Sequence, residues 1–322
     1  MGSDRKGEQV NGADPSRWSA VAEGWAELWG TFAEPAWRAI LDTTHAGHGT
    51  RVLDVGCGSG DFLAYCDRRG MVTAGIDPAP GMVELARRRS PDVRRGGAEK
   101  LPWADATFDL VTSFNALQFA EDTDDALAEL TRVTVPGGYV AVANWAEAAR
   151  NDLDAVERAL DDGPPRPDGD LRVPGGLAEL LTDGGLVDVR EALVEVPWEV
   201  PDDHTLVRGV LLGEDAGGAG AVLGSGAGGA GAVLGSGAGG AGAVLGSGAG
   251  GAGAVLGSGA GGAGAALLGE DAGGADAVLL GEDAGRAGAV LAAARPYRNR
   301  DGGYRLVNHF RYAVGRKAGG CG

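Results

Sequence analysis

The chain has 322 residues, enough for one large domain or two small ones, and carries a formal net charge of −17. This acidic balance argues against binding to a nucleic-acid backbone, which requires clustered Lys and Arg. The three cysteines, Cys57, Cys66 and Cys321, form neither a disulfide framework nor a zinc-ligand spacing, so we predict no metal site.

The N-terminal part begins with a polar tail, residues 1–15, which we expect to be disordered. It lacks the apolar core of a secretory signal, and the chain has no run of about 18 apolar residues, so we expect a cytoplasmic protein without a membrane span. Residues 16–50 are predicted to form a helical cap, because apolar residues recur there at spacings of three and four. Its tryptophans Trp18, Trp25, Trp29 and Trp37 are consistent with core packing or with a lid over a ligand.

From residue 51 to residue 200, short apolar runs alternate with amphipathic stretches. This pattern predicts βαβ units and a parallel sheet that is covered on both faces. The first strands are expected at 51–56 and 72–77, and a later one at 139–145. A Pro-Gly-Gly turn is expected to close the helix before that last strand.

Residues 201–295 are predicted to be a variable insertion with helices and a Gly/Ala repeat. Four copies of the unit AGGAGAVLGSG run from Ala216 to Gly259. Three readings stay open, namely loose structure, a packed helical array and an interaction surface. Glycine costs roughly 1 kcal/mol relative to alanine in a helix, which favours the first. The last related unit predicts a helix, and residues 296–316 predict a turn followed by a terminal strand.

The stretch LDVGCGSG places Asp54 at the end of the first predicted strand, followed by Gly56, Gly58 and Gly60. Glycine permits positive φ and lets the backbone approach a ligand closely. The helix that follows offers free N–H groups at its N-terminus. At the end of the next strand, Asp77 could accept both hydroxyls of a ribose.

We therefore expect the ligand of this loop to be a nucleoside with an anionic tail. A nicotinamide dinucleotide wants the spacing GxGxxG, whereas this loop reads GxGxG. Asp54 would also repel a pyrophosphate, but it suits the ammonium group of an amino acid. These features point to S-adenosylmethionine.

At this point the sequence resembles the class I S-adenosylmethionine-dependent methyltransferases, and is similar in particular to the quinone-biosynthesis C-methyltransferases. The motifs VLDVGCGSG, GIDPAPGMVELAR, GGAEKLPWADATFDLV and VTVPGGYVAVANW carry the resemblance. It implies an α/β, Rossmann-like sheet of seven strands in the order 3-2-1-4-5-7-6, with strand 7 antiparallel and supplied by residues 296–316. The core domain would span 51–200, with the low-complexity insertion between strands 6 and 7.

The resemblance also implies roles for single residues. Gly56, Cys57 and Gly58 would line the methionine portion of the donor, with Asp54 near its ammonium group and Asp77 at the ribose. Pro78 and Met82 would pack against the adenine, and Ala98 and Glu99 would frame its edge. The predicted donor-binding residues also include Gly60 and Gly97. Asn115 would lie near the transferable methyl group. Gly97 stands where the family usually has an aspartate, so a contact to the adenine amino group would have to come from the backbone or be lost.

The function expected from these features is methyl transfer from S-adenosylmethionine to a small-molecule acceptor by in-line displacement. Proximity and exclusion of water would supply most of the catalysis. Asn115 and His204 are weak candidates for catalytic residues. The alternatives are a non-catalytic binding protein on a degenerate methyltransferase scaffold and a nucleotide-dependent oxidoreductase.

Overall fold

The structure is a computed structural model that describes residues 14–161, 163–165, 167–217 and 282–319. The predicted tail, except residues 14 and 15, lies outside these residues, and so do the repeat copies beyond residue 217. By its contacts the chain divides into two units, Met1–Gly228 with Arg286–Gly322, and Gly229–Gly285. The second unit falls almost entirely outside the described residues, and the following concerns the first.

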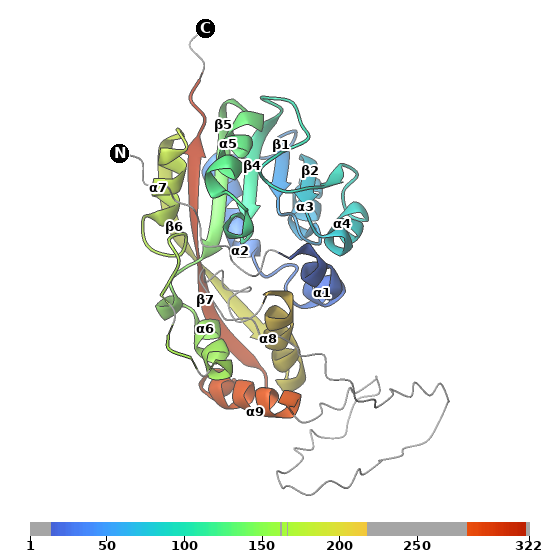
Figure 1. Cartoon of the computed structure of the whole chain (residues 1–322), viewed down its shortest axis with the longest axis vertical. Helices are drawn as coiled ribbons and strands as arrows, with labels where there is room; N and C mark the ends of the chain where they lie inside the picture. The colour runs from blue at the N-terminus through green and yellow to red at the C-terminus, as the bar shows by residue number, and fades with distance from the viewer. Residues whose placement is uncertain (1–13, 162, 166, 218–281, 320–322) are drawn as a thin grey trace, which may run out of the picture. The chain divides into compact units, whose positions relative to one another are not determined.

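Within the described residues, one sheet of seven strands has the order β3-β2-β1-β4-β5-β7-β6 (Figure 1). β1 to β5 are parallel, and β7 runs antiparallel to both of its neighbours. This confirms the predicted order and the antiparallel terminal strand. The strands are β1 (Arg51–Val55), β2 (Val72–Asp77), β3 (Val93–Arg95), β4 (Phe108–Phe114), β5 (Thr134–Trp145), β6 (Val187–Val200) and β7 (Tyr304–Arg316).

The helices of the described residues include the two of the predicted cap. Asp14 caps the first of them by accepting a hydrogen bond from the Ser16 N–H at 2.8 Å, and Pro15 follows at the first helical position. The α-helices are α1 (Pro15–Leu28), α2 (Glu34–Thr44), α3 (Asp61–Asp67), α4 (Pro80–Arg87), α5 (Thr123–Val133), α6 (Asp152–Glu157), α7 (Gly176–Asp183), α8 (Asp203–Gly217) and α9 (Glu282–Ala294). Short 3₁₀ turns lie at Leu117–Phe119, Ala148–Arg150, Arg158–Leu160 and Arg295–Tyr297.

Helices cover both faces of the sheet, as expected for a parallel sheet of near-continuous apolar strands. On one face, α2 and α3 pack against alternate strand residues such as Val52 and Leu110. On the other face, α5 and α7 pack against Leu53 and Val111. Successive side chains of β1 and β4 thus point to opposite faces of the sheet and divide the core into two layers. Neither layer covers the carboxyl ends of the parallel strands.

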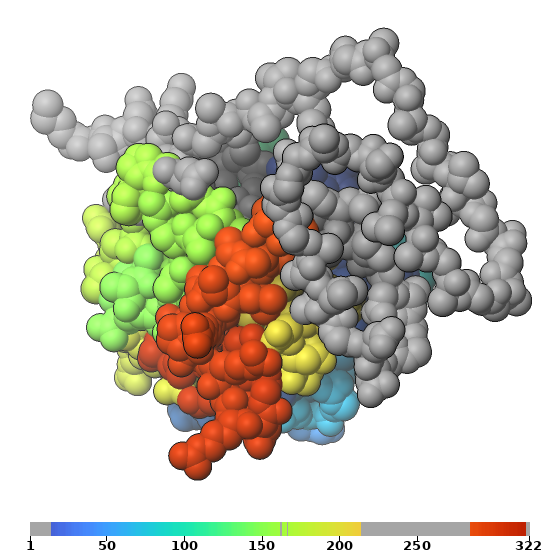
Figure 2. Space-filling view, turned by 90° about the horizontal axis from the view of Figure 1, so that it is seen from below, coloured from blue at the N-terminus to red at the C-terminus, as the bar shows by residue number. Residues whose placement is uncertain are grey.

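β6 and β7 extend beyond the carboxyl end of β5. The last residue of β5, Trp145, pairs with Phe310, whereas β7 already begins at Tyr304. The extension packs in a third cluster with α6, α8 and α9. Figure 2 views this end of the molecule, where α9 lies between the segment of α6 and α8. The helices α8 and α9 lie within the predicted insertion at 201–295, near its two ends, and α9 confirms the helix expected from the last repeat-like unit.

One local expectation was wrong. The Pro136-Gly137-Gly138 segment does not form a turn between α5 and a later strand, because β5 already begins at Thr134. The pairing with β4 shifts register between Phe108–Thr134 and Leu110–Tyr139, so the glycines form a bulge inside the strand. Gly137 has φ 82°, a conformation that this bulge can adopt because the residue has no Cβ.

Candidate donor and acceptor site

A cavity of about 360 Å³ lies at the carboxyl ends of β1, β2 and β4, within the size range of small-ligand sites. It brings together eleven of the twelve predicted donor residues, namely Asp54, Gly56, Cys57, Gly58, Asp77, Pro78, Met82, Gly97, Ala98, Glu99 and Asn115. The twelfth, Gly60, does not line it. Gly60 precedes α3 with φ 82°, and a Cβ there would stand 2.9 Å from Ala86, so its role in the structure is close packing.

The other two loop glycines also have positive φ, 76° at Gly56 and 51° at Gly58, but their surroundings differ. A Cβ at Gly56 would stand 2.2 Å from the Cβ of Ala116, whereas one at Gly58 would meet nothing within 4 Å. Gly56 is therefore required by packing between the loop and the end of β4. Gly58 instead borders open space on the side of the cavity.

Asp77 ends β2 and ties the loop in place. Its Oδ2 accepts a hydrogen bond from the Gly58 N–H and its Oδ1 accepts one from the Ala79 N–H, each at 2.9 Å. Burial raises the pKa of Asp77 to about 6, against the lowering effect of these two hydrogen bonds. Each oxygen keeps a free lone-pair direction, so the carboxylate can still accept from a ligand.

Asp54 ends β1 and is more deeply buried, at 3 % exposure. Its Oδ1 accepts a hydrogen bond from the Thr112 hydroxyl at 2.8 Å. Burial raises the pKa of Asp54 to about 7, against the lowering effect of the Thr112 hydrogen bond and with a smaller contribution from the negative charge of Asp77. No ion pair is formed by Asp54 or Asp77 within the part of the chain that the structure describes.

The charges around the cavity are all negative. Its described lining contains the carboxyl groups of Asp54, Asp61, Asp77, Glu99 and Glu121, and it contains no Lys, Arg or His. Buried charges are normally paired, so two buried carboxylates without a cation favour a positively charged ligand. This negative lining would repel a pyrophosphate.

Gly97 and Glu99 stand at the far end of the cavity. A Cβ on Gly97 would lie 2.6 Å from Oε2 of Glu99. The other oxygen of Glu99 accepts a hydrogen bond from the Glu121 N–H at 2.7 Å. The Glu99 carboxylate therefore occupies the space that a side chain at position 97 would take.

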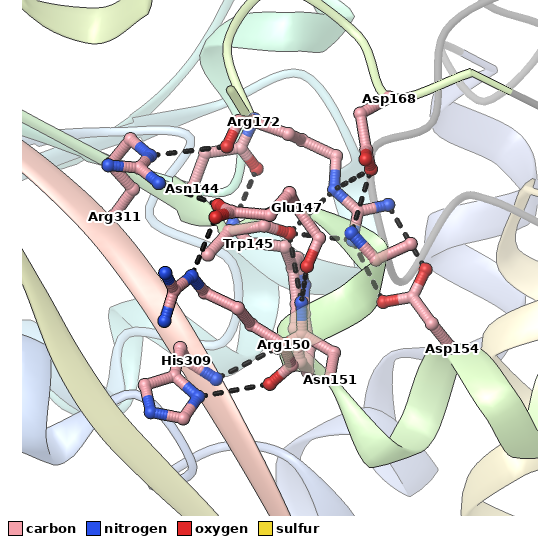
Figure 3. A network of polar contacts seen from close by, with 12 residues as sticks. Asn144, Trp145, Glu147, Arg150, Asn151, Asp154, Asp168, Arg172, His309 and Arg311 are labelled. Atoms are coloured by element: carbon pink, nitrogen blue, oxygen red, sulfur yellow. Dashed lines mark hydrogen bonds and ion pairs between the residues drawn. The ribbon is translucent and has the colours of Figure 1, made fainter. Parts of the chain in front are cut away.

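Asn115 lines the cavity just after β4, with φ 48°. Its Oδ1 accepts a hydrogen bond from the Trp145 N–H at 3.1 Å, which fixes the amide against the end of β5. The next carbonyl, that of Ala146, accepts from Nε and Nη2 of Arg172 at 2.9 and 2.7 Å. Figure 3 shows how Arg172, which is 1 % exposed, also pairs with Asp154 at 2.8 Å.

This polar network was not predicted from the sequence. It continues through Arg311 on β7, which pairs with Glu147 at 2.6 Å and donates to the Arg172 carbonyl (Figure 3). The network joins the connection after β5 to β7 and lies beside the end of β5 that holds Asn115. It is a structural support and does not line the cavity.

Of the four tryptophans of the cap, one packs in the core and three line the cavity. Trp29 belongs to the core, where it stacks on Trp198 with ring centroids 4.3 Å apart and donates to the Gly209 carbonyl. Trp18, Trp25 and Trp37 line the cavity. α1 is held over it by the hydrogen bond from the Gly81 N–H to Ser19 Oγ, at 3.2 Å.

The structure does not bring His204 to the cavity. His204 lies exposed in the first turn of α8 and does not line the cavity. His309 lies on β7 and its Nδ1 is 3.0 Å from the Arg150 carbonyl oxygen. Among the described residues, no cluster of three potential ligands could hold a metal ion. None of the described helices has the length and apolar character needed to cross a membrane.

A model of a methyltransferase domain matches residues 53–142. The chain is 38 % identical over 110 residues to the demethylmenaquinone methyltransferase of Renibacterium salmoninarum, covering 34 % of this chain and 46 % of the relative. It is 36 % identical over 115 residues to the malonyl-[acyl-carrier protein] O-methyltransferase of Serratia marcescens, covering 35 % and 45 %. The matched part thus spans a little under half the length of these curated relatives. The YcgJ protein from Bacillus aligns with a TM-score of 0.48 and 14 % identity, over 88 % of this chain and 98 % of that one.

The domain match runs from within β1 to within β5 and includes the glycine loop and both buried aspartates. The strand order and the antiparallel β7 complete the same architecture. The domain match and the sheet order support a class I S-adenosylmethionine-dependent methyltransferase, with S-adenosylmethionine as the methyl donor that the matched domain implies.

Proposed function

We propose that the protein transfers the methyl group of S-adenosylmethionine to a small-molecule acceptor. One observation carries this proposal: Asp54 and Asp77 are buried in one cavity without a cationic partner among the described residues. S-adenosylmethionine carries an ammonium and a sulfonium group beside one carboxylate, and this net positive charge suits the negative lining of the cavity. The names of the two groups of relatives, demethylmenaquinone and malonyl-[acyl-carrier protein] methyltransferases, are consistent with a methyl acceptor other than nucleic acid.

The proposed roles follow the positions of the residues in the cavity. Asp54 would hold the ammonium of the donor, and Asp77 its ribose hydroxyls. Gly58 would let the backbone approach the methionine portion, since nothing fills the space beside its Cα. Glu99, with Pro78 and Met82, would surround the adenine.

The chemistry required of the protein is modest. The sulfonium already activates the methyl carbon, so the enzyme needs to align donor and nucleophile and to exclude water. The cap at 16–50, with Trp18 and Trp25 over the cavity, would exclude water. We retain the proposed division into this cap, the core at 51–200, the insertion at 201–295 and the terminal strand at 296–316.

Calorimetry with S-adenosylmethionine and S-adenosylhomocysteine tests the proposal. We expect both to bind, and we expect the Asp54→Asn and Asp77→Asn variants to bind the cationic donor more weakly. Incubation with methyl-labelled donor and a metabolite extract should then yield a labelled product. A protein that binds the donor and labels nothing would be a binding protein on the same scaffold, and one that binds neither compound would refute the proposal.

A further inference from the structure

The side chains of β4 alternate between the two faces of the sheet, and they therefore reach two different parts of the cavity. Thr112 and Phe114 point to the face that α2 and α3 cover, and there the Thr112 hydroxyl donates to Asp54. Ser113, between them, points to the face that α5 and α7 cover, as does Val142, its paired residue on β5. The end of β4 thus presents one hydroxyl to each face.

Ser113 shares its face with an apolar part of the cavity wall. Val55, Ala98 and Leu117 line the cavity and belong to the cluster that packs between the sheet and the helices α5 and α7. Ala98 is followed by Glu99, which in the proposed function lies beside the adenine of the donor. An apolar wall with a carboxylate next to it suits a heterocyclic base that carries an amino group.

The hydroxyl of Ser113 is buried at this wall without a partner. Ser113 is 1 % exposed and lines the cavity, and its Oγ forms no hydrogen bond within the described part of the chain. Buried polar groups are nearly always hydrogen-bonded, so an unpaired hydroxyl at a cavity wall indicates a group that a ligand supplies.

A ring nitrogen of the adenine is the ligand group that fits. An ionised carboxylate such as Glu99 can only accept hydrogen bonds, so it suits the adenine amino group, whereas the ring nitrogens need a donor. The described lining contains no Lys, Arg or His. Of its two hydroxyls, that of Ser59 already donates to Asp61 at 2.5 Å, which leaves that of Ser113.

We propose that Ser113 is a further donor-binding residue, whose hydroxyl donates a hydrogen bond to a ring nitrogen of the adenine. The proposal rests on the proposed function, because it requires S-adenosylmethionine in this cavity. Ser113 would then recognise the ring of the base, while Glu99 recognises its amino group. The hydroxyl is unpaired in the free protein and paired in the complex, so its removal should affect stability and affinity in opposite ways.

The first test compares Ser113→Ala with the unmodified protein, by calorimetry with S-adenosylhomocysteine, which carries the same adenine. We expect the variant to bind about three- to tenfold more weakly, the usual effect of one hydrogen bond between neutral groups. The melting temperature of the unliganded variant should not fall, because the substitution removes an unpaired buried group.

Thr131 on α5 supplies the matched control. Its Oγ1 is likewise buried without a partner among the described residues, but Thr131 does not line the cavity. Thr131→Val removes this hydroxyl at nearly constant volume. We expect its affinity for S-adenosylhomocysteine to equal that of the unmodified protein, and its melting temperature not to fall.

The second test identifies the atom that Ser113 contacts. The 1-deaza, 3-deaza and 7-deaza analogues of S-adenosylhomocysteine each replace one ring nitrogen by a C–H group. We expect the unmodified protein and Ser113→Ala to bind one of these analogues with equal affinity, since neither complex contains the hydrogen bond. For the other two analogues, the three- to tenfold difference between the proteins should remain. This comparison holds even where the substitution changes the melting temperature.

The outcomes separate this proposal from the proposed function. Failure of the unmodified protein to bind S-adenosylmethionine or S-adenosylhomocysteine would overturn the proposed function. Normal binding by both the unmodified protein and Ser113→Ala would overturn the role of Ser113 alone. A difference between the two proteins that persists with all three deaza analogues would also overturn it, because the hydroxyl would then contact no ring nitrogen.

Discussion

The N–H of Gly58 donates to Oδ2 of Asp77 at 2.9 Å, so the proposed ribose acceptor also fixes the glycine loop. The second oxygen holds the Ala79 N–H, which precedes α4. Asp77 thus has two tasks in the structure, and a substitution there removes both. Two substitutions distinguish these tasks, because asparagine keeps one acceptor oxygen and alanine keeps none.

We predict that Asp77→Ala weakens binding of S-adenosylmethionine by about tenfold or more, because hydrogen bonds to a charged group contribute about 1.5–3 kcal/mol. Asp77→Asn should lose less, since its Oδ1 can still accept one of the two backbone hydrogen bonds. Calorimetry gives the affinities and thermal melts report the loop. Equal affinities of wild type and Asp77→Ala would rule out the ribose assignment.

The raised pKa values of Asp54 and Asp77, about 7 and about 6, predict a characteristic pH dependence of the unliganded protein. Both values lie above the ordinary value of 3.8, so the folded state binds protons more tightly than the unfolded state. The stability that these groups contribute is full below pH 3.8 and is lost as the pH rises through 6 and 7. Asp54→Asn removes one such group, so its free energy of unfolding should fall less between pH 5 and pH 8 than that of wild type.

Donor binding should show the opposite trend, because a cationic donor favours the ionised carboxylates. Affinity for S-adenosylmethionine should decrease as the pH is lowered from 8 to 5.5, and Asp54→Asn should flatten part of this change. Calorimetry at the two pH values measures both proteins. Identical pH profiles of the two would show that Asp54 does not face the cation.

Much of the fold could be predicted because its signals are local. The buried runs of β1 and β2 and the glycine loop between β1 and α3 are each contained in a few consecutive residues. The network around Arg172 could not be predicted in this way. Its partners lie far apart in sequence, as in the Arg311 hydrogen bond to the Arg172 carbonyl, and an isolated arginine in a polar segment has the pattern of a solvated loop. The contact of Glu99 with the space beside Gly97 is equally invisible without coordinates.

Gly58 provides a test of backbone approach. We predict that Gly58→Val abolishes detectable donor binding, because the side chain would enter the open space beside the loop. Valine also fits poorly at φ 51°, so some loss of stability is expected from strain. Gly58→Asn is the control for strain, since asparagine tolerates this conformation better. If Gly58→Asn keeps wild-type donor affinity, the open space does not belong to the donor.

Arg172 provides a test of the network in Figure 3. We predict that Arg172→Met lowers the free energy of unfolding by about 3–5 kcal/mol, because it leaves Asp154 and the Ala146 carbonyl without their partner. Arg305→Met is the matched control. Arg305 is paired with Glu195 at the surface, at 3.2 Å, and exposed pairs contribute about 0–1 kcal/mol. Chemical denaturation measures the free energy of unfolding of both variants. Similar losses in the two would show that the buried network contributes no more to stability than an exposed ion pair.

Glu99 is the last residue for which the structure makes a specific prediction, because its carboxylate fills the space beside Gly97. We expect this carboxylate to accept a hydrogen bond from the amino group of the adenine. It would thereby replace the aspartate that the family usually has where this chain has Gly97. Glu99→Ala should then weaken binding of S-adenosylhomocysteine by about tenfold, since one hydrogen bond to a charged group is lost. The deaminated analogue, S-inosylhomocysteine, should bind both proteins equally. Gly97→Asp alone would place a second carboxylate against the first and should weaken binding, whereas Gly97→Asp combined with Glu99→Ala should restore it. Failure of the double variant to recover, with unchanged melting temperature, would show that the adenine is not read at this place.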